Sequence, residues 1–486
     1  MRISPIQRRP HFFTALVSVC VLFLNHSAAN SIPQIRGLPE HALAALPETV
    51  QLAVLLDNAA QLRATEGGQK MWSIVSSTGF FSQIEQSWPT LATDLEFTPE
   101  QAFDELLGRR VIIATNASFE DKSQWVLITH VTAAVEQSLR NRLRPANRGL
   151  FQGFPILSVG GGKYQLATST ITADDNSEKL SIIILAPGGT TLFEDVLKSF
   201  GSNTAADQVL PVPRLNGRVD AMMLMRNPES SRRTLIAATI GMRSWDLEFA
   251  SDNSQGTPVS TLPAAITQRL FANTENTCFA AATATGAGKS ASGFEIFDSV
   301  LWTLLPLDHA IQQSFASGAA LSISPAKSVS WALPLSDSKT AAASTDSYIS
   351  TLFASIDRAG PSFRGESPTA IRTFHTHISV ANPLARLLEP DIAVQWQTQT
   401  ASDNRTWWIA TCGESADSTA ATRSNCVYHF LLRPQAAIST LSSAQMLESA
   451  PFSALKQIRL IEFSAFANPE QGASWCNGSG RVELVP

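Results

Sequence analysis

The segment Arg109–Leu143 constrains the fold more than any other part of the chain. It reads RRVIIATN, then the polar run ASFEDKS, then QWVLITHV, then TAAVEQSLRNRL. The β-branched residues on both sides of the polar run favour two strands joined by a turn, because such side chains suit a pleated, partly buried surface. Thr132 is the expected N-cap of a helix in which Val135, Leu139 and Leu143 form one apolar stripe. The segment therefore predicts strand, turn, strand and helix, a packing unit without chemistry of its own.

Similar patterns recur along the chain. SIIILAPGGTTLFEDVLKSF and CVYHFLLRPQAAISTL also read as strand, polar break and helix. A duplicated strand–turn–strand–helix module and the ordinary make-up of an α+β protein explain this recurrence equally well. Strands often follow strands through turns, as at Gly160–Gly162, which favours antiparallel pairing. We predict an α+β fold of two lobes, with mainly antiparallel sheets covered by helices.

The amino terminus has the three parts of a secretory signal peptide. Arg2, Arg8 and Arg9 give a basic start, Phe12–Leu24 is mostly apolar, and Ser27-Ala28-Ala29 supplies the small residues that a signal peptidase requires. The apolar run is shorter than the roughly 20 residues that span a bilayer. We expect cleavage after Ala29 and a periplasmic or extracellular location.

Charge and length limit the possible binding partners and the number of domains. The chain carries a net charge of −5, and the predicted signal contains three arginines and no acid, so the mature chain is more acidic still. Nucleic-acid binding calls for a basic face and is not expected. We expect no transmembrane segment in the mature chain. At roughly 150 residues per domain, we expect a signal peptide (1–29), an N-terminal lobe (30–205) and a C-terminal lobe (206–486) with a sub-boundary near 360–368.

The first half of the chain also resembles a known group of proteins. The runs LPETVQLAVLLDNAAQL, FDELLGRRVIIAT, WVLITHVTAAVEQSLRNRL, GFPILSVGGGKYQLAT and LFEDVLKSF are similar to exported bacterial proteins grouped as a domain of unknown function. The resemblance covers residues 46–200 and thins afterwards. It implies an envelope-associated, non-catalytic protein and assigns no catalytic residue.

Four cysteines follow the predicted signal peptide, an even number that is compatible with disulfides in an exported protein. Cys412 follows the expected strand Thr406–Thr411, and Cys426 precedes the expected strand Val427–Leu432. If these strands pair as a hairpin, the two cysteines lie opposite each other at its mouth, within reach of a disulfide. We predict a Cys412–Cys426 bridge, which leaves Cys278 and Cys476 as the other pair.

Two patterns bear on catalysis. On the expected strand FHTHISV, His375 and His377 alternate onto one face, an arrangement that zinc enzymes use. Spacing does not single out a third ligand among His309, His429 and Glu389, and a solvent-facing histidine pair explains the pattern too. TATGAGKS resembles a phosphate-binding loop, but Thr283 replaces its first glycine. We expect a polar turn there, and no cofactor.

Trp407 and Trp408 are neighbours on an expected strand, so one should face the core and the other outward. An outward tryptophan suits recognition of a protein or glycan, although core packing is the commoner explanation. The leading interpretation is an exported, non-enzymatic envelope or extracellular protein that binds an unknown protein, glycan or small ligand. The alternative is a metal-dependent hydrolase that uses His375 and His377.

Overall fold

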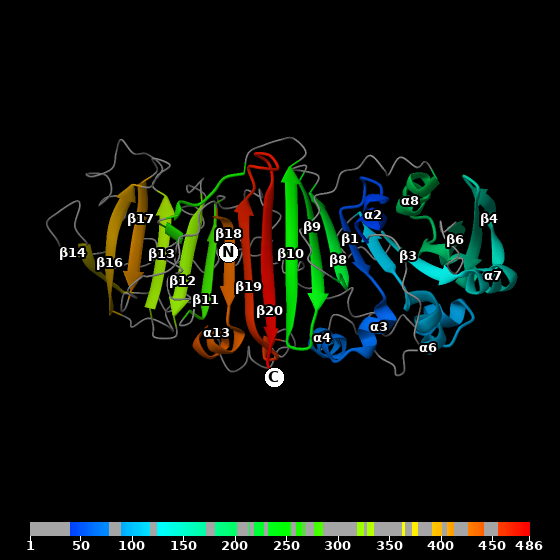
Figure 1. The fold of residues 1–486 in the computed structure, drawn as a ribbon, viewed down its shortest axis with the longest axis horizontal. Coiled ribbons are helices and arrows are strands. Elements are labelled where there is room, and N and C mark those ends of the chain that lie inside the picture. The colour runs from blue at the N-terminus through cyan, green and yellow to red at the C-terminus, as the bar shows by residue number, and fades with distance from the viewer. Residues whose placement is uncertain are drawn as a thin grey trace, which may run out of the picture. The chain divides into compact units, whose positions relative to one another are not determined.

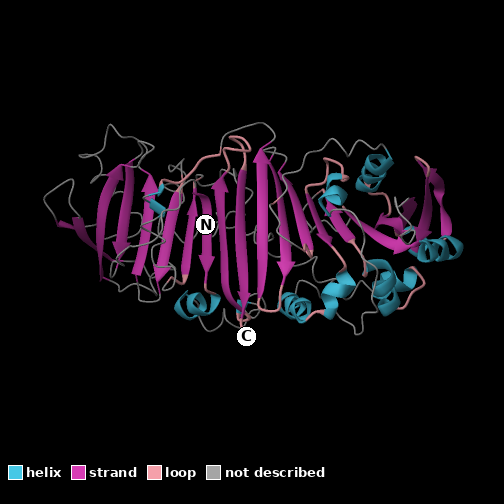
Figure 2. Cartoon of the chain, in the orientation of Figure 1, coloured by secondary structure: helices cyan, strands magenta, loops and turns pink. Residues whose placement is uncertain are grey.

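The structure is a computed structural model. It describes residues 39–76, 89–116, 124–171, 180–201, 213, 218–227, 232–253, 259–264, 266–267, 277–284, 318–324, 328–334, 362–364, 372–377, 391–400, 406–412, 426–441 and 455–486. The predicted signal peptide lies outside these residues. The chain divides into two compact units, unit 1 up to Ala250 and unit 2 from Ser251. Strands dominate the drawing of both units (Figures 1 and 2).

Unit 1 is built on an antiparallel sheet in which β1 pairs with β2 on one side and with β8 on the other. The order of its described strands is β10–β9–β8–β1–β2–β3–β7–β6–β5–β4. Their bounds are β1 (Leu52–Leu56), β2 (Val111–Thr115), β3 (Trp125–Thr132), β4 (Arg144–Phe151), β5 (Phe154–Val159), β6 (Tyr164–Ile171), β7 (Leu180–Pro187), β8 (Ala221–Asn227), β9 (Arg232–Ile240) and β10 (Ser244–Asn253).

Short helices pack on both faces of the central strands of unit 1. Alternate residues of these strands form one core cluster with α2 (Pro39–Ala44) and α8 (Thr191–Gly201). The other face contacts the π-helical turn η2 (Phe103–Leu107) and α7 (Ala133–Arg142), both of which touch β3. The other α-helices in the described part of this unit are α3 (Ala59–Ala64), α4 (Glu66–Ser76) and α6 (Pro99–Ala102). Every residue of β2 is buried as a result.

Unit 2 is also an antiparallel sheet. Its described strands follow the order β20–β19–β18–β11–β12–β13–β17–β16–β15–β14. Their bounds, with that of the helix α13, are β11 (Phe279–Thr283), β12 (Ala319–Ser324), β13 (Ser328–Pro334), β14 (Ser362–Arg364), β15 (Arg372–His377), β16 (Asp391–Thr400), β17 (Thr406–Cys412), β18 (Cys426–Leu432), α13 (Pro434–Leu441), β19 (Ile458–Ala467) and β20 (Cys476–Leu484).

The two units share one topology. Adding ten to each strand number of unit 1 gives the strand order of unit 2, from β4 and β14 at one edge to β10 and β20 at the other. Backbone hydrogen bonds recur at equivalent positions as well. The pairs, donor N–H first, are Gln51–Thr115 with Cys278–Ile323, Arg226–Gln51 with Arg433–Cys278, and Asp57–Asp220 with Ala284–Val427. The repeated element is therefore a ten-strand unit, far larger than the strand–turn–strand–helix module suggested by the sequence.

The predicted α+β class is wrong. The molecule is a sheet-rich fold of mostly antiparallel strands, and its described helices contain only 4–11 residues each. The predicted lobe boundary at 205/206 also needs correction, because β8 and β9 follow it but belong to unit 1, where β8 pairs with β1.

Several local predictions are confirmed. Residues 109–143 form β2, β3 and α7, and the Thr132 side chain accepts a hydrogen bond from the Val135 backbone N–H at 3.2 Å. Gly160–Gly162 joins the paired strands β5 and β6, and all three glycines have positive φ. Among the described residues, the helices are too short or too polar to cross a membrane.

Candidate functional site

A shallow hollow of about 460 Å³ lies on unit 1 between α7 and the segment that leads into η2. Its size is within the range of small-ligand sites. One wall comes from residues around α6 and the other from the exposed side of α7. The lining residues are Glu96, Phe97, Gln101, Glu105, Thr132, Ala134, Val135, Ser138 and Arg142.

A reciprocal cap shapes the first wall. Thr98 N–H donates to Gln101 Oε1, and Gln101 N–H donates to Thr98 Oγ1, both at 3.2 Å. This capping box satisfies two backbone donors at the start of α6. Glu96, two residues earlier, has φ +60°, a conformation uncommon for residues other than glycine. The tight turn places Glu96 and Phe97 opposite α7.

Arg142 connects the two walls. Its Nη1 donates to the Glu96 carbonyl at 2.8 Å, and its guanidinium carbon lies 4.5 Å from the centre of the Phe97 ring. Its Nε also donates to the Ser138 carbonyl on its own helix at 3.3 Å. Stacking of an arginine on an aromatic face is favourable by about 0.5–1 kcal/mol at exposed sites. Arg142 therefore braces the hollow.

The charges of the lining favour a cationic ligand. Glu96 and Glu105 are both exposed at the hollow and contribute two acidic side chains to its lining. The Arg142 guanidinium is already committed to two backbone carbonyls and a ring. Gln101, Thr132 and Ser138 add neutral polar groups to the lining. The lining combines two carboxylates, hydrogen-bonding groups and an aromatic ring, which is suited to binding.

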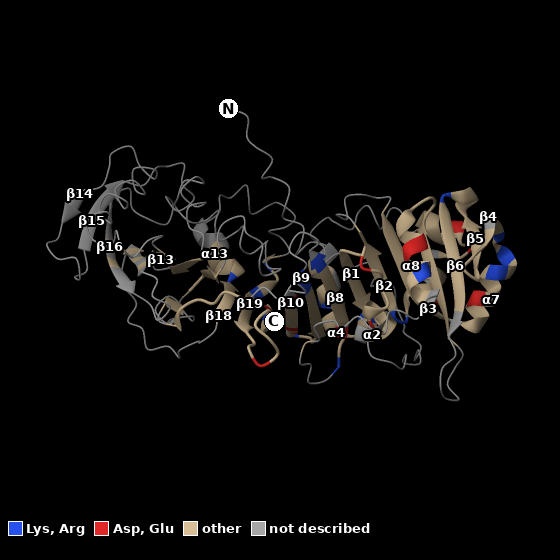
Figure 3. Ribbon diagram, turned by 90° about the horizontal axis from the view of Figure 1, so that it is seen from above, with Lys and Arg blue, Asp and Glu red and all other residues tan. Residues whose placement is uncertain are grey.

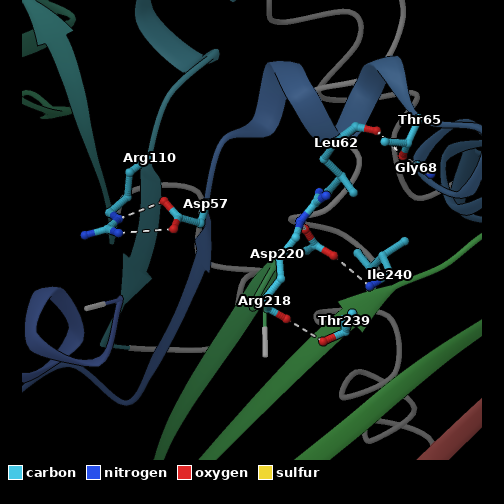
Figure 4. Close-up of polar contacts among 9 residues, drawn as sticks. All are labelled: Asp57, Leu62, Thr65, Gly68, Arg110, Arg218, Asp220, Thr239 and Ile240. Atoms are coloured by element: carbon cyan, nitrogen blue, oxygen red, sulfur yellow. Dashed lines mark hydrogen bonds and ion pairs between the residues drawn. The ribbon is translucent and has the colours of Figure 1, made fainter. Parts of the chain in front are cut away.

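A second polar feature, which we call the polar row, crosses the unit 1 sheet at one end of β8, β1, β2 and β3 (Figure 4). It consists of Asp220 just before β8, Asp57 just after β1, Arg110 just before β2 and His130 near the end of β3, at positions that continue the pairing registers of these strands. Figure 4 draws the first three of these residues. Asp57 N–H donates to the Asp220 carbonyl at 3.0 Å, and His130 N–H donates to the Arg110 carbonyl at 3.1 Å. All four residues lie on the face that carries the core cluster with α2 and α8.

Ion pairs neutralise most of the polar row. Arg110 Nε lies 3.0 Å from Asp57 Oδ1, and its Nη2 lies 3.1 Å from Oδ2, a bidentate pair in which both side chains are largely buried. Asp220 contacts Arg218 and accepts a hydrogen bond from the Ile240 N–H at 2.8 Å. Burial nevertheless raises the pKa of Asp220 above its ordinary value.

His130 is the titratable group of the polar row with the largest change. Burial lowers its pKa to about 4, and the neighbouring positive charge of Arg110 adds to the effect. Its Nδ1 is buried and has no hydrogen-bond partner among the described residues. His130 is therefore neutral at pH 7. Because Arg110, Asp57 and Asp220 are largely buried and their ion pairs lie within unit 1, we interpret the polar row as a structural clamp between neighbouring strands.

The predicted Cys412–Cys426 hairpin is wrong. β17 pairs with β13 and β16, whereas β18 pairs with β11 and β19. Strands β13, β12 and β11 therefore separate the two, which at ~4.8 Å per spacing amounts to about 19 Å. A disulfide needs Cα atoms within about 7 Å. Cys426 is accordingly buried and forms no disulfide.

The second predicted disulfide fails for a similar reason. Phe279, the residue after Cys278, begins a row of paired residues that crosses the sheet and ends at Val482 on β20. Cys476 lies six residues from Val482 along β20, which is roughly 20 Å at ~3.3 Å per residue. Both cysteines are buried and form no disulfide. Burial also raises the pKa of the Cys278 thiol to about 11, so it is a poor nucleophile. The row is Phe279, Leu432, Ile461 and Val482.

The structure places His375 and His377 on β15, opposite Ala393 and Asp391 of β16. Their side chains lie outside the described part, as do His309 and Glu389. His429 is on β18, six strand spacings or about 29 Å from β15, and its Nδ1 lies 2.9 Å from Ser464 Oγ. His429 is therefore excluded as their third ligand. Among the described residues there is no group of three metal-ligating side chains.

Of the two neighbouring tryptophans on β17, the structure describes the side chain of Trp407. Trp407 is fully buried and belongs to the unit 2 core cluster with Ile409 and Leu431, so it is not a recognition residue. The Trp408 side chain lies outside the described part. Thr283 ends β11, and the rest of TATGAGKS after Ala284 is also outside it.

The residues of the hollow were missed by sequence reasoning, apart from Thr132 as a helix cap. Their common feature is spatial, since α7 and α6 are separated by two strands in the sequence. The polar row left a clearer signal, because Asp57, Arg110 and Asp220 each flank an apolar strand. No family model, curated protein or solved structure matches the chain.

Proposed function

We propose that this chain is an exported, non-enzymatic protein that binds a ligand bearing a cationic group in the hollow on unit 1. The observation that carries the proposal is the placement of the Glu96 and Glu105 carboxylates around the braced Phe97–Arg142 pair. Export is supported by the basic, apolar and small-residue segments before Asn30. The ligand class includes a small amine, a basic segment of a partner protein and an amino sugar.

The open form of the hollow supports binding over catalysis. Catalytic groups act in enclosed sites where water is excluded and pKa values are displaced. Here the two carboxylates are exposed, and the lining combines them with neutral groups and an arginine that already has partners. An exposed charge pair contributes about 0.2–1 kcal/mol, so each carboxylate would favour a cationic ligand by up to about fivefold.

A peptide panel tests the proposal. Calorimetry would compare three peptides of the same length, with lysine, glutamine or glutamate at the centre of a glycine background. We expect the lysine peptide to bind most tightly and to be recovered unchanged. Ala134→Arg should abolish its binding, because the added side chain fills the hollow and carries like charge.

Gln137→Arg provides the matched control, since Gln137 is exposed on the same helix but outside the hollow. It should bind the lysine peptide as the wild type does. Equal binding of all three peptides, or unchanged binding by Ala134→Arg, would refute the proposal.

A further inference from the structure

Glu96 holds a backbone conformation that residues other than glycine rarely adopt. Its φ is +60°, in the left-handed region where a Cβ atom crowds the following carbonyl oxygen. In the described part of the chain, Asn58 and Gln152 are the other non-glycine residues with positive φ. Of these three residues, Glu96 is the one that lines the hollow on unit 1.

The fold requires this backbone conformation but not this side chain. The Glu96 N–H donates to the Thr93 carbonyl at 2.9 Å, and the Phe97 N–H donates to the Ala92 carbonyl at 2.9 Å. These two bonds form a Schellman motif, a helix ending in which glycine is the usual residue at the left-handed position. Arg142 also binds the Glu96 backbone, through the carbonyl. Glycine would therefore make all of these contacts without the strain.

The carboxylate of Glu96 makes no hydrogen bond or ion pair among the described residues. Acidic residues on the helices of unit 1 provide the contrast, because Glu136 pairs with Arg140 on α7 and Asp195 pairs with Lys198 on α8 (Figure 3). Glu96 is instead exposed at the edge of the hollow. Its side chain thus adds no polar contact that would offset the strain of its backbone.

Strained backbone positions concentrate at binding sites, where function retains what stability alone would remove. We propose, on the basis of the proposed binding function of the hollow, that Glu96 is the residue that pairs with the cationic group of the ligand and determines specificity. Its left-handed backbone is retained for this contact. The hydrogen bonds on both sides of Glu96 fix where its side chain leaves the wall, so ligand binding requires little ordering of the backbone.

Two substitutions at Glu96 separate the carboxylate from the strain. Glu96→Gly removes both, so it should raise the thermal unfolding midpoint of the mature chain by roughly 2–4 °C. It should also weaken calorimetric binding of the lysine peptide by up to about fivefold. Glu96→Gln removes the charge but keeps the backbone conformation, so it should weaken binding to the same extent without raising the midpoint.

Gln152→Gly is the matched control for relief of strain. Gln152 is exposed, has φ +48° and follows β4 in the turn to β5, outside the hollow. Its replacement by glycine should also raise the unfolding midpoint, but it should leave binding of the lysine peptide unchanged. A gain in stability alone is therefore distinguished from loss of the carboxylate.

Support requires that Glu96→Gly gain stability and lose affinity, while Glu96→Gln loses affinity alone. Wild-type affinity in Glu96→Gly would overturn the role of Glu96 but leave the proposed function standing, provided that Ala134→Arg still abolishes binding. An unchanged or lower midpoint in Glu96→Gly would also overturn the proposal, because the backbone would then hold no strain. If the wild type does not prefer the lysine peptide to the glutamine and glutamate peptides, the proposed function fails, and the role of Glu96 fails with it.

Discussion

Arg110 and Asp57 form the closest-fitting ion pair of the polar row, since both oxygens of the carboxylate meet the guanidinium at 3.0–3.1 Å. Breaking a buried pair from one side leaves an unpaired charge. We expect Arg110→Met to lower the free energy of unfolding by about 3 kcal/mol. Adding Asp57→Asn should recover part of the loss, as measured by denaturant unfolding. A double variant whose losses simply add would show that the pair is not coupled.

His130 should make stability depend on pH. Its pKa falls from 6.5 to about 4 on folding, so the unfolded chain binds the proton more tightly and acidification favours unfolding. Between pH 6.5 and about 4 this loss amounts to about 3 kcal/mol. Asp220 acts in the opposite direction, because its raised pKa favours the protonated folded state.

Comparison with a single variant isolates the histidine. His130→Gln retains a polar side chain that does not titrate, so the difference between wild type and variant cancels the contribution of Asp220. We expect the unfolding free energy of the variant to fall less steeply below pH 6.5, as followed by urea titrations at several pH values. Parallel curves for the two proteins would contradict this.

Thr132 shows how one cap fixes an element. Its side chain accepts from the Val135 N–H at 3.2 Å where β3 ends and α7 begins without a loop. Thr132→Ala should destabilise the protein by about 1 kcal/mol, whereas Thr132→Ser should retain most of the stability. Thermal unfolding of both variants provides the measurement, and equal losses would show that the hydroxyl does not act as a cap.

The elements that the sequence predicted well are those with local signals. Thr132 marked a helix start as a cap residue, and Gly160–Gly162 marked a turn in which all three glycines have positive φ. β4 was missed because Pro145 and Gly149 lower its strand propensity, and pairing with β5 overrides that preference.

At the scale of the whole molecule, the strand order in each sheet depends on pairing between strands that are distant in the sequence, which could not be predicted from the sequence. β8 and β18 each pair in the middle of their own sheet, with β1 and β11 respectively. No local sequence pattern predicts these long-range pairings. The same long-range order overturned the disulfide prediction. The two units also differ in chemistry, since the positions equivalent to Asp57, Arg110 and Asp220 are Ala284, Gly318 and Val427. The polar row thus belongs to unit 1.

Export is a prediction for the whole chain. The basic start, apolar run and small residues imply removal of the segment that ends at Ala29. N-terminal sequencing of the protein from the periplasm or medium should begin near Asn30. Ala29→Arg should cause an uncleaved precursor to accumulate, because signal peptidases require a small residue there. A cytosolic protein that retains Met1 would rule out export.

The order of strands in unit 2 is the most direct test of the repeated ten-strand topology. Phe279 lies opposite Leu432 across β11 and β18, whereas a β17–β18 hairpin would place Thr406 opposite Leu432. In a Cys278→Ala background, oxidation of the Phe279→Cys/Leu432→Cys variant should yield a cross-link that peptide mapping locates between these positions. The Thr406→Cys/Leu432→Cys variant should stay reduced, because about 19 Å separates its strands. A cross-link in the second variant and none in the first would contradict the repeated topology.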